Sequence, residues 1–126
     1  MSQDFYLGNP NLKKVGTEIQ FTKHQIQEYL KCKEDPVYFA MNYIKIISLD
    51  EGIVPFKMWD FQQELIESFH EHRFNIAKLP RQTGKSTTCV SYLLHYILFN
   101  DNVNVGILAN KLSTARDLLS RLQLAY

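Results

Sequence analysis

The segment Leu79–Thr87 combines residue types that bind phosphate. Within it, Gly84 is followed directly by Lys85 and Ser86, the order found where a loop opens a helix beneath a nucleotide. The unpaired N–H groups at a helix N-terminus and the positive end of the helix dipole attract phosphate oxygens. In such loops the lysine reaches the β- and γ-phosphates and the hydroxyl coordinates Mg²⁺. The sequence therefore predicts a site for a nucleoside triphosphate and Mg²⁺.

The elements expected around this loop are those that such a site requires. Residues 74–79 alternate like a strand that runs into the loop, and 87–99 should form the helix that follows it. The apolar run 103–108 predicts a second, buried strand, and Ser113 should cap a helix over 114–124. This order predicts an α/β fold with a parallel sheet of the P-loop NTPase type, of which only the first strands are present.

A small helical region is expected before the sheet. Thr22 and Gln25 fit a capping box, which predicts a short helix. Asp35 before Pro36 marks a second helix start. The apolar run that follows, up to Ile47, predicts a mostly buried helix, although its last β-branched residues could instead begin a strand.

Composition and charge set the class of protein. The chain has 126 residues, 45% of them hydrophobic, which is enough for one modest globular domain with a core. A net charge of +1 gives no support for a nucleic-acid or membrane partner. No apolar run approaches the roughly 18 residues of a membrane span, and no leader is evident. We expect a cytosolic protein, neither secreted nor anchored, with Cys32 and Cys89 as reduced thiols.

One position departs from the common loop pattern, because Leu79 stands where that pattern has its first glycine. The loop Arg81–Ser86, with the sequence Arg-Gln-Thr-Gly-Lys-Ser, resembles the deviant Walker A of the large terminase subunits of tailed bacteriophages, especially the T4-like group. Further similarities to that group lie along nearly the whole chain. They are Asp35–Phe39, Pro55–Met58, the glutamine Gln62 and Gly106–Lys111.

The resemblance implies an ATP-driven motor that moves double-stranded viral DNA into a procapsid, with a separate C-terminal nuclease in the full-length protein. It implies that Arg81 acts on the γ-phosphate beside Lys85, that Gln62 lies against the adenine, and that Ser86 binds Mg²⁺. The full set of implied ATP-binding residues is Gln62, Arg81, Gln82, Thr83, Gly84, Lys85, Ser86 and Thr87. The implied partners are the portal protein, the small terminase subunit and further copies in a ring, in the host cytoplasm and transiently at the portal.

Three parts are expected: a tail over 1–20, a helical subdomain over 21–55, and the first part of an ATPase core over 56–126, which opens with an amphipathic helix over 58–72. No apolar strand ending in Asp-Glu follows the loop, so we expect an N-terminal part of a longer ATPase that is itself inactive. Two alternatives stay open. One is a superfamily 2 helicase-like ATPase, and the other is a non-catalytic module in which 1–55 docks the portal or the small subunit.

Plainer interpretations compete at single positions. Arg81 is equally a solvated loop charge by its residue type, and Gln62 a solvent-facing helix residue. Trp59 and Phe61 are interpreted as core residues rather than as a platform on which a base stacks. Lys111 and Arg116 follow the second predicted strand, where a solvated helix start is at least as good an interpretation as a DNA contact.

Overall fold

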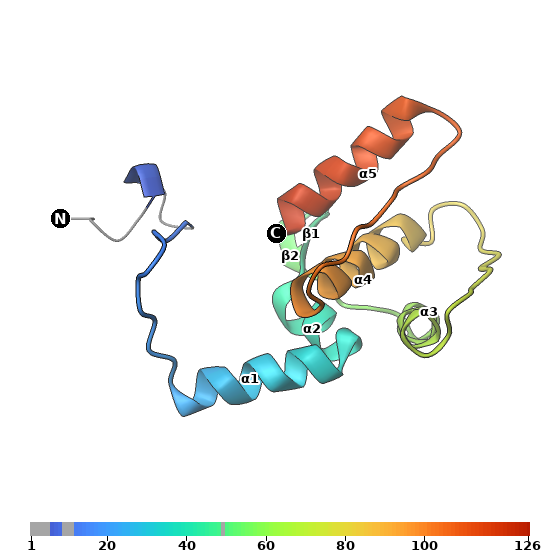
Figure 1. Cartoon of the computed structure of the whole chain (residues 1–126). Helices are drawn as coiled ribbons and strands as arrows, with labels where there is room; N and C mark the ends of the chain where they lie inside the picture. The colour runs from blue at the N-terminus through green and yellow to red at the C-terminus, as the bar shows by residue number, and fades with distance from the viewer. Residues whose placement is uncertain (1–5, 9–11, 49) are drawn as a thin grey trace.

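A computed structural model describes residues 6–8, 12–48 and 50–126 of the chain. Helices dominate these residues (Figure 1). The elements are a short 3₁₀ turn η1 (Tyr6–Gly8), the helices α1 (Lys23–Glu34), α2 (Pro36–Tyr43), α3 (Asp60–Glu71), α4 (Lys85–Phe99) and α5 (Leu112–Ala125), and the strands β1 (Lys45–Ser48) and β2 (Gly52–Pro55). No described helix is both long and apolar enough to cross a bilayer.

Both helix starts predicted in the small helical region, at Thr22 and at Asp35, are confirmed. The Thr22 hydroxyl accepts from the Gln25 N–H at 3.2 Å, and the Gln25 carboxamide accepts from the Thr22 N–H at 2.9 Å, which completes the capping box of α1. Asp35 caps α2, since its carboxylate accepts from the N–H groups of Val37 and Tyr38. Of the predicted tail over 1–20, residues 1–5 and 9–11 lie outside the described residues, and 12–20 contain no helix.

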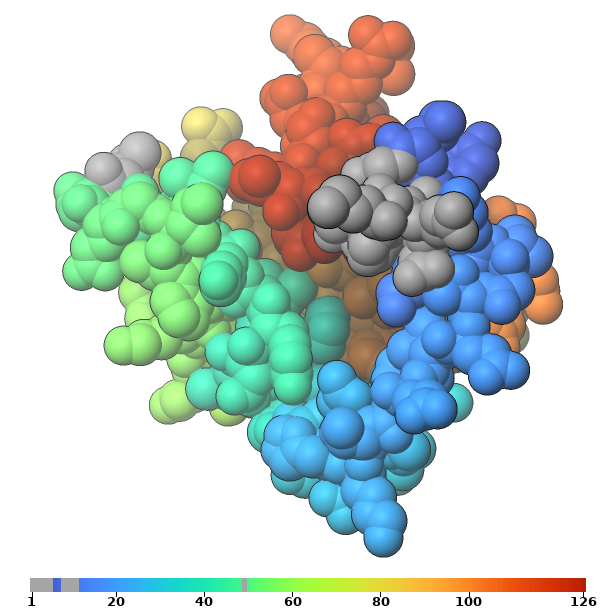
Figure 2. All heavy atoms as spheres, turned by 90° about the vertical axis from the view of Figure 1, so that its left-hand side faces the viewer, coloured from blue at the N-terminus to red at the C-terminus, as the bar shows by residue number. Residues whose placement is uncertain are grey.

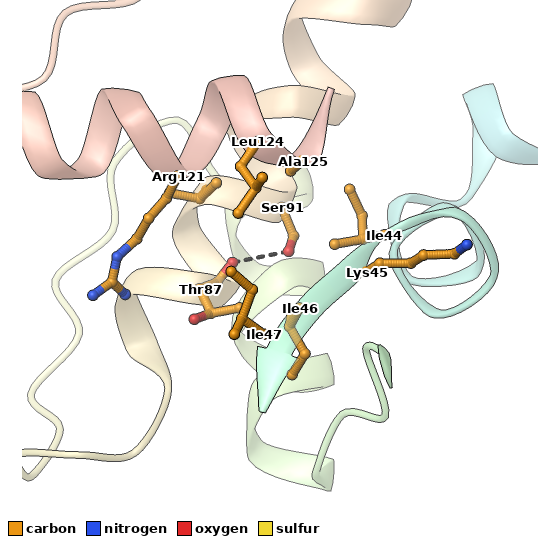
Figure 3. A pocket seen from close by; sticks show the side chains of 10 residues that line it. Ile44, Lys45, Ile46, Ile47, Thr87, Ser91, Arg121, Leu124 and Ala125 are labelled. Carbon is orange, nitrogen blue, oxygen red and sulfur yellow. Dashed lines mark hydrogen bonds between the residues drawn. The ribbon is translucent and has the colours of Figure 1, made fainter. Parts of the chain in front are cut away.

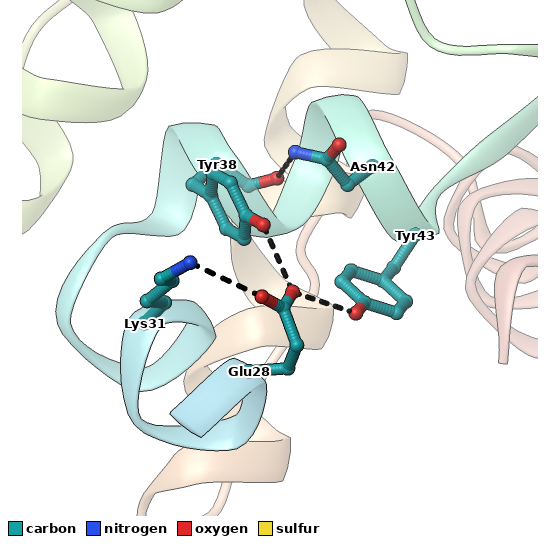
Figure 4. A network of polar contacts seen from close by, with 5 residues as sticks. All are labelled: Glu28, Lys31, Tyr38, Asn42 and Tyr43. Atoms are coloured by element: carbon teal, nitrogen blue, oxygen red, sulfur yellow. Dashed lines mark hydrogen bonds and ion pairs between the residues drawn. The ribbon is translucent and has the colours of Figure 1, made fainter. Parts of the chain in front are cut away.

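A carboxylate joins the first two helices (Figure 4). Glu28 of α1 accepts hydrogen bonds from the hydroxyls of Tyr38, at 2.8 Å, and Tyr43, at 3.1 Å, both on α2. The Lys31 ammonium lies 3.2 Å from the other carboxylate oxygen. The hydrogen bonds from Tyr38 and Lys31 lower the pKa of Glu28, and the carboxylate raises the pKa of both tyrosines. The network therefore ties α2 to α1 by hydrogen bonds between side chains.

The apolar run after Pro36 divides into a helix and a strand. α2 ends at Tyr43, and Ile46 and Ile47 belong to β1, which pairs antiparallel with β2. The β-branched residues therefore begin a strand, which was the alternative left open by their type. Ile47 lies opposite Ile53 in this hairpin, and both remain largely exposed.

The core forms where α4 passes between the other helices. α4 contacts α2, α3 and α5 and lies near the centre of the molecule (Figure 1). The buried apolar residues of this core cluster come from both sides of the expected boundary at 55/56 and are Cys32, Phe39, Ala40, Ile44, Phe56, Met58, Ile66 and Leu94. His95 is buried with them at 2% exposure, and its Nε2 lies 2.7 Å from the carbonyl oxygen of Cys32. Both cysteines are free.

The predicted parallel sheet is wrong. Residues 74–79 and 103–108 form no strand, and the sheet that the described residues contain is the two-stranded antiparallel hairpin β1–β2. Alternating apolar side chains suit a strand only where a neighbouring chain accepts its backbone hydrogen bonds and covers its faces. Here those faces are uncovered: Phe74, Ile76 and Leu108 are 83%, 102% and 93% exposed.

α5 is the last described helix, and only part of it packs against the rest of the molecule. It begins after Lys111, with no side-chain cap, so the predicted cap at Ser113 is wrong. Leu122 and Ala125 pack against the core, whereas Leu112 at the other end is 67% exposed. Figure 2 shows the first turns of α5 standing out at the top of the molecule and its C-terminal end beside the hairpin. α5 is therefore held against the core mainly at its C-terminal end.

Candidate functional site

The predicted loop forms a turn that ends in a left-handed glycine at the start of α4. Gly84 has φ 69° and ψ 16° and is the N-cap of the helix. The first backbone bond of α4 runs from the Thr88 N–H to the Gly84 oxygen at 3.0 Å. Gly84 offers no side-chain cap, so the N–H groups of Lys85, Ser86 and Thr87 have no acceptor within the helix. These groups make the N-terminus of α4 suited to an anion.

Side chains within the loop hold it closed. The Thr83 hydroxyl donates to the Pro80 oxygen at 3.0 Å, and the Lys85 ammonium donates to the Leu79 oxygen at 3.4 Å. Gln82 adopts φ 60°, a left-handed conformation that is unusual for a residue with a side chain. Two left-handed positions, Gln82 and Gly84, thus shape a narrow turn whose lysine folds back across it.

Gln62 reaches this loop from α3. Its Oε1 accepts from the Trp59 N–H at 3.0 Å, and its Nε2 donates to the Thr83 oxygen at 3.1 Å. The side chain is only 5% exposed. The solvent-facing interpretation of Gln62 is therefore wrong, and the structure brings this residue together with the loop. The adenine contact that the resemblance implies stays a prediction.

The remaining predicted site residues lie on the loop and on the first turn of α4. Arg81, Gln82 and Lys85 are exposed, whereas Thr83, Ser86 and Thr87 are half-buried. Lys85, Ser86 and Thr87 form the first turn of α4, which begins two residues before the predicted start at 87. The apolar pattern misses this turn because its first two residues are polar. All eight predicted ATP-binding residues thus lie on the loop, on the first turn of α4 or in contact with them.

A cavity of about 310 Å³ lies behind the first turns of α4 (Figure 3). Thr87 and Ser91 of α4 line it together with Arg121 of α5 and an apolar wall from β1. The Ser91 hydroxyl donates to the Thr87 oxygen at 2.8 Å, so it is satisfied within the helix. Sequence reasoning missed Arg121, because no local pattern tells on which side of α4 the helix α5 will pack.

Candidate metal ligands near the loop are few. No group of three or more His, Cys, Asp or Glu side chains that could hold a metal occurs among the described residues. The Ser86 hydroxyl, at the first turn of α4, fits the single protein oxygen that a loop of this kind offers to Mg²⁺, whose other ligands are phosphate oxygens and water. The residues present therefore suit a metal that arrives with the nucleotide.

The aromatic pair beside Gln62 differs from its interpretation as core. Trp59 is 64% exposed at the start of α3, and its ring lies 5.7 Å from that of the half-buried Phe61. The indole therefore faces solvent one helical turn from the glutamine that touches the loop.

No protein-family model matches this sequence.

Proposed function

We propose that this chain binds the phosphates of ATP on the loop Leu79–Thr87 and supplies the ATP-binding part of a large-terminase-like DNA-packaging ATPase. The observation that carries the phosphate assignment is the left-handed Gly84 that opens α4 and leaves its first N–H groups without a helix acceptor. A glycine is needed there because a side chain at positive φ is strained and would hold the anion away from the backbone.

Each loop residue has a part in the proposal. The N–H groups of Lys85, Ser86 and Thr87 bind phosphate oxygens, and the Lys85 ammonium leaves the Leu79 oxygen for the β- and γ-phosphates. Ser86 holds Mg²⁺. Arg81, exposed on the loop, stabilises the charge on the γ-phosphate during transfer.

The larger assignment rests on the resemblance to terminase sequences, on the residues quoted above. Under it, the protein couples ATP hydrolysis to translocation of double-stranded viral DNA, in a ring on the procapsid portal and with the small terminase subunit. The residues that would activate water, an apolar strand ending in Asp-Glu, are not in this sequence. We therefore propose binding, and not turnover, for the chain as given.

Titration of the chain with ATP and Mg²⁺ tests the phosphate assignment. Lys85→Ala should weaken binding at least tenfold, the order expected when a charge-assisted contact to phosphate is lost. Lys78→Ala is the matched control, because Lys78 is an exposed lysine just before the loop, and it should leave the affinity unchanged. Equal affinity of Lys85→Ala and the unmodified chain would contradict the proposal.

The coding DNA tests the larger assignment. An open reading frame that continues past Tyr126 into an apolar strand ending in Asp-Glu, and later into clustered aspartates, supports the terminase. Helicase motifs at that place would favour a helicase-like ATPase instead. An immediate stop codon would contradict the proposed motor and favour a docking module.

A further inference from the structure

We infer that Gln62 is a positioning residue of the phosphate loop, which it ties to the first turn of α3 whatever base the nucleotide carries. The inference rests on the proposed triphosphate site for its ligand and on the Gln62 contacts for its geometry. It goes beyond the adenine contact that the resemblance implies, because it assigns the glutamine to the loop backbone.

Both ends of the Gln62 carboxamide are engaged with backbone groups. Oε1 caps the start of α3 by accepting from the Trp59 N–H, and Nε2 donates to the Thr83 oxygen. One planar amide thus joins the start of a helix to a loop that lies far away in sequence. At 5% exposure, little of this amide is open to an incoming base.

The glycine next to this contact shows how closely the amide approaches the loop. A Cβ built on Gly84 would lie 2.6 Å from Nε2 of Gln62, closer than atoms can pack. Gly84 therefore meets two requirements, the positive φ of 69° and room for the carboxamide. The Thr83 oxygen that Gln62 binds belongs to the peptide unit whose N–H is that of Gly84. Holding that peptide fixes the direction from which the chain enters α4.

Loop geometry limits anion binding because the N–H groups of Lys85–Thr87 must converge on one phosphate. If the Thr83–Gly84 peptide rotates, these N–H groups lose their common direction, and ordering them again costs affinity. The penalty falls on the phosphates and not on the base. The two possible roles of Gln62 can therefore be told apart by the ligand. Loss of a positioning glutamine lowers the affinity for every polyphosphate equally, whereas loss of a base contact lowers the affinity for ATP alone.

Gln62→Glu is the sharpest variant, because a carboxylate still accepts from the Trp59 N–H but cannot donate to the Thr83 oxygen. Binding of ATP, GTP and inorganic tripolyphosphate, each with Mg²⁺, is measured for this variant. We expect all three affinities to fall by the same factor, about tenfold. Gln63→Glu is the matched control, with the same change of charge at the next position of α3. It should leave all three affinities near those of the unmodified chain.

A loss confined to ATP, with GTP and tripolyphosphate unchanged, would overturn the inference and support the adenine contact. Failure of the unmodified chain to bind any of the three ligands would instead contradict the proposed function.

The contact between Gln62 and the loop is tested separately by urea unfolding of Gln62→Ala, Gly84→Ala and the double variant. We expect Gly84→Ala to lower the unfolding midpoint less when Gln62 is already alanine, since part of its cost is the clash. Equal shifts in both backgrounds would overturn the contact.

Discussion

Ile66 and Ile76 are the same residue type at opposite extremes of exposure. Ile66, in α3, is 0% exposed in the core, and Ile76, in the segment without helix or strand that follows, is 102% exposed. A helix satisfies its backbone hydrogen bonds within itself, so its apolar face needs only a neighbour to pack against. An extended segment depends on another chain segment for its backbone as well as its side chains. Of the two isoleucines, the packed one is therefore the one whose backbone hydrogen bonds are local.

The largest expected effect tests this division directly. Ile66→Ala should lower the free energy of unfolding by about 2 to 5 kcal/mol, because it removes a fully buried side chain from the core. Ile76→Ala should change it by less than about 0.5 kcal/mol. Urea unfolding measures both. If Ile66→Ala leaves too little folded protein, Ile66→Val should still cost about 1 kcal/mol. A comparable loss in the Ile76 variant would show that the segment 74–79 is packed.

A smaller effect contrasts two helix starts. Asp35→Ala should cost about 1 kcal/mol, since the Asp35 carboxylate caps two N–H groups of α2. Ser113→Ala should cost almost nothing, because α5 begins after Lys111 and Ser113 does not cap it. Thermal or urea unfolding of the two variants decides the matter. A larger cost at Ser113 would mean that the helix starts where the sequence pattern places it.

The smallest expected effect is a dependence on pH that originates in the core. Burial lowers the pKa of His95 from its ordinary value of 6.5, although the hydrogen bond to the Cys32 oxygen acts in the opposite direction. His70 of α3 and Lys33 and Asp35 near the end of α1 also face it. Below the ordinary pKa the unfolded chain binds more protons than the folded one, so the stability that is fully present above that pH falls as the pH falls.

Urea midpoints on the two sides of the ordinary histidine pKa measure this dependence. His95→Gln keeps a donor for the Cys32 oxygen but does not titrate, so its midpoint should vary less with pH. His24→Gln, at an exposed position of α1, should vary as the unmodified chain does. An unchanged slope in the His95 variant would place the titrating group elsewhere.

Local contacts were within reach of sequence reasoning. Thr22 and Gln25 stand three residues apart and bond each other, and Asp35 bonds the N–H groups that follow it. The loop before α4 was recognisable for the same reason, since Gly84 and Lys85 act next to each other. At these positions the chemistry lies within one turn of chain, so residue order carries it.

Contacts between distant segments were out of reach. The alternation over 74–79 suits a strand, but no pattern within it says whether a partner strand is present. The hydrogen bond from Gln62 to Thr83 joins α3 to the loop, and the packing of α5 puts Arg121 on the wall of the cavity that Thr87 also lines. Each depends on how helices pack, which the sequence of either partner alone does not specify.

The packing of α5 at one end alone should affect how fast its amide hydrogens exchange with solvent. The core holds its C-terminal end through Leu122 and Ala125, while the end that begins at Leu112 stands out from the surface. Opening those first turns breaks few apolar contacts, so their amide hydrogens should exchange with solvent through local motion. The amides around Leu94, in the middle of α4, should exchange only when the whole core opens. Hydrogen exchange should therefore be slow at the amides of the core and fast at the first turns of α5. Those turns open locally many times between two openings of the whole core.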